Sequence, residues 1–205
     1  MRTLRSLLLV TGLLSGVLFL NAPPLAAQAG RCAGLASTPQ QVKCVLVNGS
    51  FPELEALLEE RLPDVTDEDL RLVIEGLAYE RGQGNILAML GLGAIHEAGL
   101  GPIPPDLGRA AGYYLDAAAA GATEGMLRVA MIYCDGRIPA PDLECLYFLR
   151  NAAEFGQVDA LLILAEQLVA KTGDVDGAKT YLEKAIALGV PGAEAALLAL
   201  LQSRI

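Results

Sequence analysis

The sequence predicts an all-α solenoid built from antiparallel helix pairs, and three observations support this fold class. Apolar residues make up 53% of the chain, yet only 5% is aromatic and Trp is absent, so Ala and Leu must form a core that favours helices over strands. Four glycines recur at intervals of 37, 35 and 33 residues, namely Gly84, Gly121, Gly156 and Gly189. Small and aromatic residues recur at fixed offsets around them, as in two-helix repeats.

Residues 1–29 have the pattern of a secretory signal. Arg2 and Arg5 provide a positive start, an uncharged apolar run follows, and the segment ends with a small-x-small motif. Cleavage after Ala29 fits this motif, and cleavage after Ala27 is the competing position. A retained membrane anchor is the alternative, although a helical span needs about 20 apolar residues and this run is shorter. We therefore expect an exported, periplasmic protein of bacterial origin.

The net charge limits the classes of partner. Removal of Arg2 and Arg5 with the signal takes the formal charge from −9 to −11. An acidic chain of this kind repels phosphate backbones and anionic lipid surfaces. We predict no nucleic-acid partner and, after signal removal, no membrane span.

The four cysteines predict disulfides. An even number of cysteines in an exported chain is typical of disulfide pairing, and four cysteines allow three connectivities. The close spacings favour Cys32 with Cys44 and Cys134 with Cys145. A zinc site fits less well, because the chain has no C-x-x-C pair and its single histidine, His96, is not spaced as part of a ligand set. We predict no metal and no cofactor.

Residues 30–83 precede the repeats and predict an N-terminal helical cap. Apolar stripes and start signals indicate helices over 39–47, 52–62 and 67–81, the last opening with Thr66 as its cap. A module of about fifty residues is only marginally stable alone. We therefore expect this segment to pack on the end of the solenoid, held by the Cys32–Cys44 link.

Residues 84–205 contain the repeats. Eleven, eight and four residues before three of the glycines stand a small, an aromatic and a small residue: Ala110, Tyr113 and Ala117; Cys145, Phe148 and Ala152; Ala178, Tyr181 and Ala185. Four residues after each glycine stands another small residue: Ala88, Gly125, Ala160 and Ala193. These offsets place small residues on one helical face, which allows close packing. Each unit is a helix A, a loop and a helix B, and about three units are followed by a terminal helix A that covers the end of the stack.

These residues resemble Sel1-like repeats, which are related to tetratricopeptide repeats. The shared pattern is A-x-x-x-L-G-x-x-Y-x-x-G, then D, then A-x-x-W/Y-Y-x-x-A-A-x-x-G. Residues 88–121 match it well with His96 in the aromatic place, and residues 125–156 match nearly as well. The unit over 160–189 departs in its first half and is closer to a tetratricopeptide repeat. The resemblance implies a right-handed α-solenoid that binds other proteins.

The sequence contains no recognisable set of catalytic residues. The motifs G-x-S-x-G and H-E-x-x-H are missing, and we expect a packed, hydrogen-bonded role for His96. The run Lys171-Thr172-Gly173 matches one β-lactamase motif, but its companions S-x-x-K and S-D-N are missing. We therefore expect no enzymatic activity. A cell-wall-related hydrolase or β-lactam-binding protein is the alternative class.

In tetratricopeptide-like stacks the helices A line the inner wall, where a partner lies. By this register, the predicted partner-binding residues are Leu87, Leu90, Glu97, Glu124, Leu127, Met131, Asp135, Asp159, Leu162 and Glu166. They predict an apolar strip with acidic edges, suited to a peptide or helix with apolar anchors and basic flanks. Burial of the leucines inside a tight superhelix is the alternative interpretation.

The sequence therefore favours a periplasmic scaffold or regulator that holds a protein partner of the cell envelope. A structural subunit of an envelope complex is a further alternative, because it requires the same fold and the same lack of a catalytic site.

Overall fold

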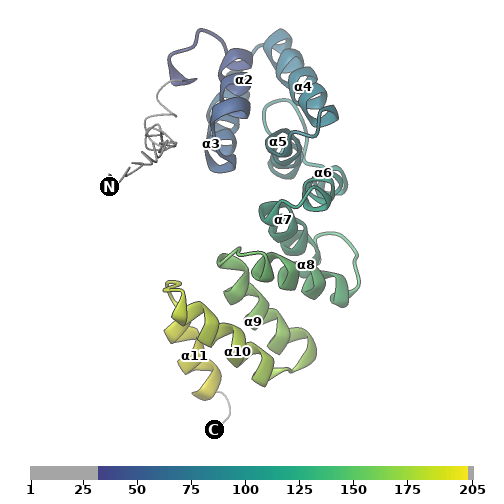
Figure 1. Cartoon of the computed structure of the whole chain (residues 1–205). Helices are drawn as coiled ribbons and strands as arrows, with labels where there is room; N and C mark the ends of the chain where they lie inside the picture. The colour runs from purple at the N-terminus through teal and green to yellow at the C-terminus, as the bar shows by residue number, and fades with distance from the viewer. Residues whose placement is uncertain (1–31, 203–205) are drawn as a thin grey trace, which may run out of the picture.

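The computed structural model describes residues 32–202, so the predicted signal over 1–29 lies outside the described residues. Within this range the chain forms ten α-helices and a short 3-10 helix, and no strand. Figure 1 shows the helices following one another as an elongated stack from α2 to α11. The all-α solenoid prediction is confirmed. None of the described helices is long and apolar enough to span a membrane.

The predicted cap contains α2 (Thr38–Asn48), α3 (Phe51–Arg61), η1 (Leu62–Asp64) and α4 (Asp67–Gly82). Local hydrogen bonds define where these helices begin. The Ser50 backbone N–H donates to the Glu53 carboxylate at 2.8 Å, and the Asp69 N–H donates to Thr66 Oγ1 at 3.1 Å. The three α-helices agree with the predicted ranges to within one residue at each end.

The repeats form three helix pairs and a terminal helix: α5 (Ile86–Ala98) with α6 (Leu107–Ala119), α7 (Thr123–Cys134) with α8 (Asp142–Glu154), α9 (Asp159–Thr172) with α10 (Val175–Ala187), and α11 (Ala193–Gln202). The four anchoring glycines have φ angles of 84°, 90°, 99° and 71° in chain order. This left-handed conformation favours glycine and ends a helix. The repeated glycine therefore turns the chain from one pair into the next.

The recurring small residues lie where helices meet. Nine of them are fully buried: Ala88, Ala110, Ala117, Cys145, Ala152, Ala160, Ala178, Ala185 and Ala193. Gly125 marks a close approach of two helices, because a Cβ added there would lie 2.8 Å from the Tyr114 carbonyl oxygen and 2.9 Å from the Ala117 Cβ. The α6 and α7 backbones are therefore almost in contact.

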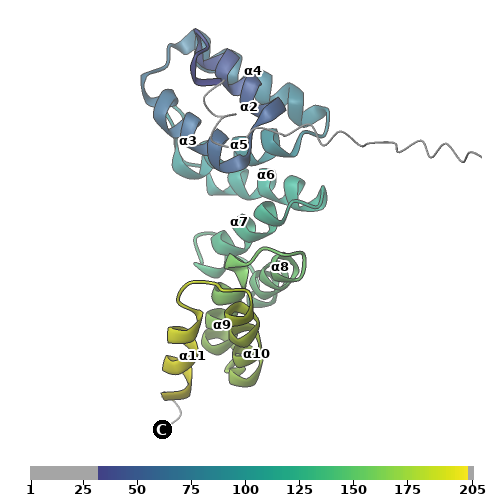
Figure 2. The same cartoon turned by 60° about the vertical axis from the view of Figure 1, so that its left-hand side comes forward.

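The core consists of three clusters in series. One joins α2, α3 and α4 to α5, the second joins α5, α6 and α7, and the third runs from α7 to α11. The main contacts join helices one or two positions apart in the chain. The stack seen in Figures 1 and 2 is therefore held by its neighbouring pairs, as in other repeat proteins.

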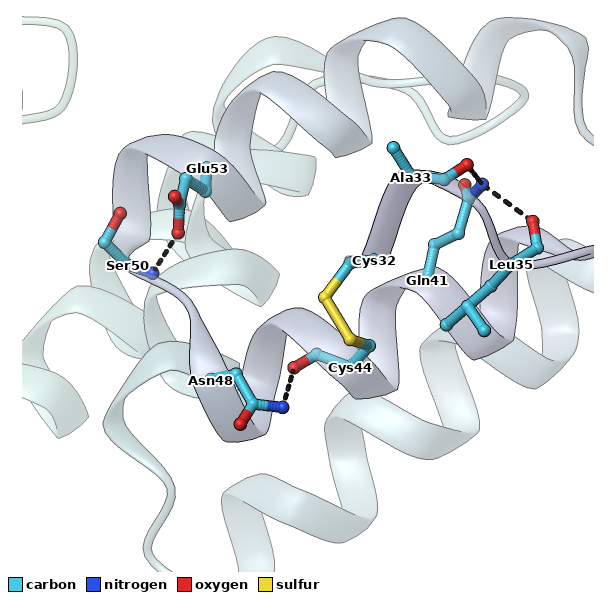
Figure 3. The surroundings of a disulfide bond; sticks show 8 residues. All are labelled: Cys32, Ala33, Leu35, Gln41, Cys44, Asn48, Ser50 and Glu53. Atoms are coloured by element: carbon cyan, nitrogen blue, oxygen red, sulfur yellow. Dashed lines mark hydrogen bonds between the residues drawn. A yellow bond between two sulfur atoms is a disulfide. The ribbon is translucent and has the colours of Figure 1, made fainter. Parts of the chain in front are cut away.

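Both predicted disulfides are present. The Cys32–Cys44 bond has a Cα–Cα distance of 5.6 Å and ties the start of the described chain to α2 (Figure 3). The Cys134–Cys145 bond, with a Cα–Cα distance of 5.1 Å, joins the end of α7 to α8. The amide of Gln41 also donates to the carbonyls of Ala33 and Leu35, at 3.3 and 3.0 Å, and so fixes the turn beside the first bond.

We expect the chain to contain no free thiol under denaturing, non-reducing conditions and four after reduction, because all four cysteines are paired. Alkylation with a mass tag followed by mass spectrometry measures this number. Two or more tagged cysteines before reduction would contradict the pairing.

Candidate protein-binding surface

Helices α5, α7 and α9 are the first helices of the three pairs, and α11 is the terminal helix A. We call the side of the stack that these four helices form the A-helix wall. All ten predicted partner-binding residues belong to α5, α7 and α9 or directly follow one of them. The predicted set therefore spans the first helices of all three repeat units.

Arg128 on α7 connects the upper part of this wall. Its Nη2 donates to Glu55 Oε2 on α3 at 2.9 Å, and its Nε donates to Glu124 Oε1 at 2.8 Å. Its Nη1 lies 3.7 Å from Glu97 Oε2 on α5, and its guanidinium lies 5.1 Å from the centre of the Phe51 ring. One half-buried cation therefore contacts carboxylates from three helices.

The charge state of Arg128 is secured by these partners. Burial acts to lower the pKa of Arg128, but the hydrogen bond with Glu124 and the charge of Glu55 outweigh it and raise that pKa. Glu124 is held further by the Gln157 amide, which donates to its Oε2 at 2.9 Å. Glu124 is therefore bound on both oxygens.

Glu97 is likewise enclosed, with 18% of its side chain exposed. The Tyr114 hydroxyl donates to Glu97 Oε2 and Arg137 Nη2 donates to Glu97 Oε1, both at 2.8 Å. Burial, followed by the charge of Glu97, raises the pKa of Tyr114, so the phenol stays protonated and continues to donate. The predicted acidic edge is thus largely paired within the protein in the first two units.

The predicted leucines divide into two groups. Leu90 and Leu127 are 3% and 6% exposed and belong to the core. Leu87, Met131 and Leu162 are half-buried and pack against core clusters. Leu90 shares its cluster with Phe51, because α3 packs on α5 and covers the wall at the first unit.

Three predicted acidic residues face solvent, namely Asp135, Asp159 and Glu166. Asp135 lies 3.7 Å from Arg137, whereas Asp159 and Glu166 stand on α9 with no ion pair among the described residues. The partner-binding role of the set stays a prediction, and its exposed acidic members concentrate in the lower half of the wall.

The lower half also contains a groove of about 340 Å³ between α9 and α11, with α10 as its floor. Eight apolar residues and Glu166 line it: Ala165, Val169, Ala170, Ala178, Leu182, Ala196, Ala199 and Leu200. The sequence predicts α11 only as a closing helix and does not indicate this groove. Its signal was the excess of small and apolar residues on α11, where Leu198 and Leu201 remain exposed.

His96 lies on the other side of α5 and is 9% exposed. Its ring stacks on Tyr113, with centroids 5.6 Å apart and an interplanar angle of 15°. The ring is therefore packed, as its register predicts. The expected hydrogen bond is not made by Nδ1, which is buried and has no partner among the described residues. Burial, then the charge of Arg109, lowers the pKa of His96, while Asp106 opposes this shift.

We expect the folded chain to lose stability as the pH falls below the ordinary histidine pKa of 6.5. The pKa of His96 is lower in the folded state, so the unfolded chain binds the proton more readily. The contribution of His96 to the free energy of unfolding is therefore complete only above pH 6.5. Urea unfolding from about pH 7.5 to about pH 5 measures the loss. His96→Phe keeps a ring beside Tyr113 and should show a smaller loss; equal losses would contradict the assignment.

Comparison with known proteins identifies the fold. No protein-family model and no curated protein matches the chain. A solved protective antigen of uropathogenic Escherichia coli with an SLR fold is similar, with a TM-score of 0.59, 22% identity and 80% of this chain covered. A Sel1 repeat protein from Oxalobacter formigenes is similar with a TM-score of 0.54, 16% identity and 76% coverage. The chain has the Sel1-like repeat fold.

Within the Sel1-like repeat fold, the chain corresponds to part of each similar protein. It spans 36% of the E. coli antigen and 65% of the O. formigenes protein. The described residues contain no group of three or more His, Cys, Asp or Glu side chains that could hold a metal ion.

Proposed function

We propose that this chain is a periplasmic protein-binding scaffold that holds a peptide or helix of a partner protein against the lower A-helix wall. The groove between α9 and α11 carries this proposal, because it joins an apolar lining to an exposed carboxylate at its rim. Helical repeat proteins use such walls to bind extended or helical partners.

The lining of the groove determines which partner fits. Its many alanines leave room for one large apolar side chain, and Val169 and Leu200 provide apolar contact on either side. An apolar anchor in such a pocket supplies most of the affinity of a small interface. Asp159 and Glu166 are exposed on α9 and favour basic residues flanking the anchor, which mainly guide encounter and orientation.

The upper wall is less suited to a partner. Phe51 and Glu55 of α3 lie over it, and Arg128 binds the carboxylates that would otherwise attract a basic ligand. A partner there would have to displace internal ion pairs. We therefore restrict the proposed site to α9 and α11.

The periplasmic part of the proposal rests on two features. The first is the signal pattern of residues 1–29, and the second is the presence of two disulfides, which form and persist in oxidising compartments.

Site-specific crosslinking tests this function. A photoreactive residue at Val169 should crosslink one defined protein in intact cells, identified by mass spectrometry, whereas the same residue at Leu143, which is 76% exposed on α8, should not. With that protein purified, Asp159→Lys combined with Glu166→Lys should weaken binding by about tenfold through the reversed charge.

A matched double variant controls for net charge. Glu154→Lys with Glu183→Lys changes the same number of exposed carboxylates on α8 and α10 and should leave binding unchanged. Equal crosslinking from Val169 and Leu143, or equal binding by both double variants, would refute the groove as the site.

A further inference from the structure

A second concave feature lies on the other side of the stack, between α4 and α6. It is a trough of about 560 Å³. Leu70, Ile74 and Ala78 of α4 form one wall, Tyr113 of α6 contributes to the other, and Leu92 of α5 lines it as well. No part of this trough overlaps the groove between α9 and α11.

A contact between α4 and α6 braces the trough. Arg81 of α4 pairs with Asp116 of α6 at 2.5 Å, and its guanidinium lies 5.3 Å from the centre of the Tyr113 ring. This ion pair joins residues 35 positions apart in the sequence. The two walls are therefore tied together across α5, so the site is largely formed before any ligand arrives.

The repeat register explains why there is space here. His96 and Tyr133 occupy the same place, twelve residues after Gly84 and Gly121. Tyr133 packs its ring against Phe148, with centroids 6.1 Å apart. In the first unit the smaller imidazole takes that place, so less volume is filled between the flanking helices.

The polar groups of the trough differ in their availability. Arg71 is committed to Glu68 and Glu75 through three hydrogen bonds. Arg109 is 69% exposed and contacts only Asp106 among the described residues, at 3.3 Å through Nε. His96 is nine-tenths buried, lines the trough and has an unpartnered Nδ1. Arg109 is therefore the cation that a ligand can engage without breaking an existing network.

We propose that this trough binds a small aromatic monocarboxylate, with the carboxylate on Arg109 and the aromatic ring between the apolar wall of α4 and the stacked rings of His96 and Tyr113. A planar guanidinium matches a carboxylate with two parallel hydrogen bonds, and aromatic rings pack favourably against one another. Asp67 lines the same trough, and its charge adds to the cost of every negative charge that a ligand brings, so a monocarboxylate is favoured over dicarboxylates and phosphates.

The test uses para-fluorohydrocinnamate and the mature full-length chain. Fluorine NMR should show saturable binding with a Kd on the order of 1 mM, as expected for a ligand of this size. The ring protons of His96, the single histidine of the chain, should shift along the same titration curve. The neutral amide of the same compound should bind at least about tenfold more weakly.

Variants distinguish this site from nonspecific binding. Arg109→Gln should weaken binding by about tenfold, whereas Arg150→Gln, at an exposed arginine of α8, should have no effect. His96→Tyr should fill the trough and abolish binding while the chain stays folded by circular dichroism. A non-saturable titration, equal binding of acid and amide, or unchanged binding by Arg109→Gln would overturn the proposal. These outcomes are independent of partner binding between α9 and α11.

Discussion

Gly125→Ala should destabilise the chain by about 2–3 kcal/mol, whereas Gly112→Ala should stabilise it by about 0.5–1 kcal/mol. Both substitutions add one methyl group inside a helix, so they share the gain in helix propensity. At Gly125 the new Cβ would lie 2.8 Å from the Tyr114 carbonyl oxygen and 2.9 Å from the Ala118 nitrogen, both backbone atoms of α6. At Gly112 nothing lies within 4 Å.

Backbone cannot move aside as a flexible side chain can, so α6 and α7 must separate in Gly125→Ala. Separation at this point also weakens the junction between the second and third core clusters, which meet on α7. Because each pair is held mainly by its neighbours, the loss should divide the stack instead of spreading evenly. Urea unfolding followed by far-ultraviolet circular dichroism should then show a broader or two-step transition.

Equal stability of the two glycine variants would show that the α6–α7 contact is looser than the structure indicates. A sharp single transition of Gly125→Ala at lower urea concentration would support the close α6–α7 contact. It would contradict the expectation that the two halves of the stack unfold separately.

The fold was predictable because its determinants are local and repeated. A left-handed glycine ends each helix B, and small residues recur at the helix contacts within the repeats, so the same signal appears in every unit. The cap helices were predictable from their own start signals, of which Thr66 is one. The pairing of cysteines followed from their close spacing.

The site was less predictable because it depends on how the cap lies across the repeats. Glu55 and Arg128 are 73 residues apart, and nothing in the period of the repeats relates them. The repeat pattern predicts Leu90 on an open wall, because it contains no information about α3. In the structure Phe51 of α3 shares a core cluster with Leu90. The pair Glu124 and Arg128, four residues apart on one helix, was the visible part of the network.

Arg128→Gln should destabilise the chain by about 2–3 kcal/mol. Removing one partner of a well-buried ion pair typically costs about 3–5 kcal/mol, and we discount this because 24% of the Arg128 side chain is exposed. The loss leaves Glu55 and Glu124 close to one another without their shared cation. It also removes the contact of the guanidinium with the Phe51 ring, so α3 loses two of its ties to the repeats.

The location of the loosened helices in Arg128→Gln distinguishes a local loss of the α3 contacts from a general loss of stability. Hydrogen exchange should become faster in α3 of Arg128→Gln, while the amides of α9 and α10 keep their protection. The hydrogen-bond network around Arg128 ends at Gln157, just before α9 begins. Arg71→Gln is the control: Arg71 makes ion pairs with Glu68 and Glu75 on the exposed face of α4, so its loss should leave stability and exchange almost unchanged. Uniformly faster exchange in Arg128→Gln would mean that Arg128 supports the whole stack and not specifically the closure of the upper wall by α3.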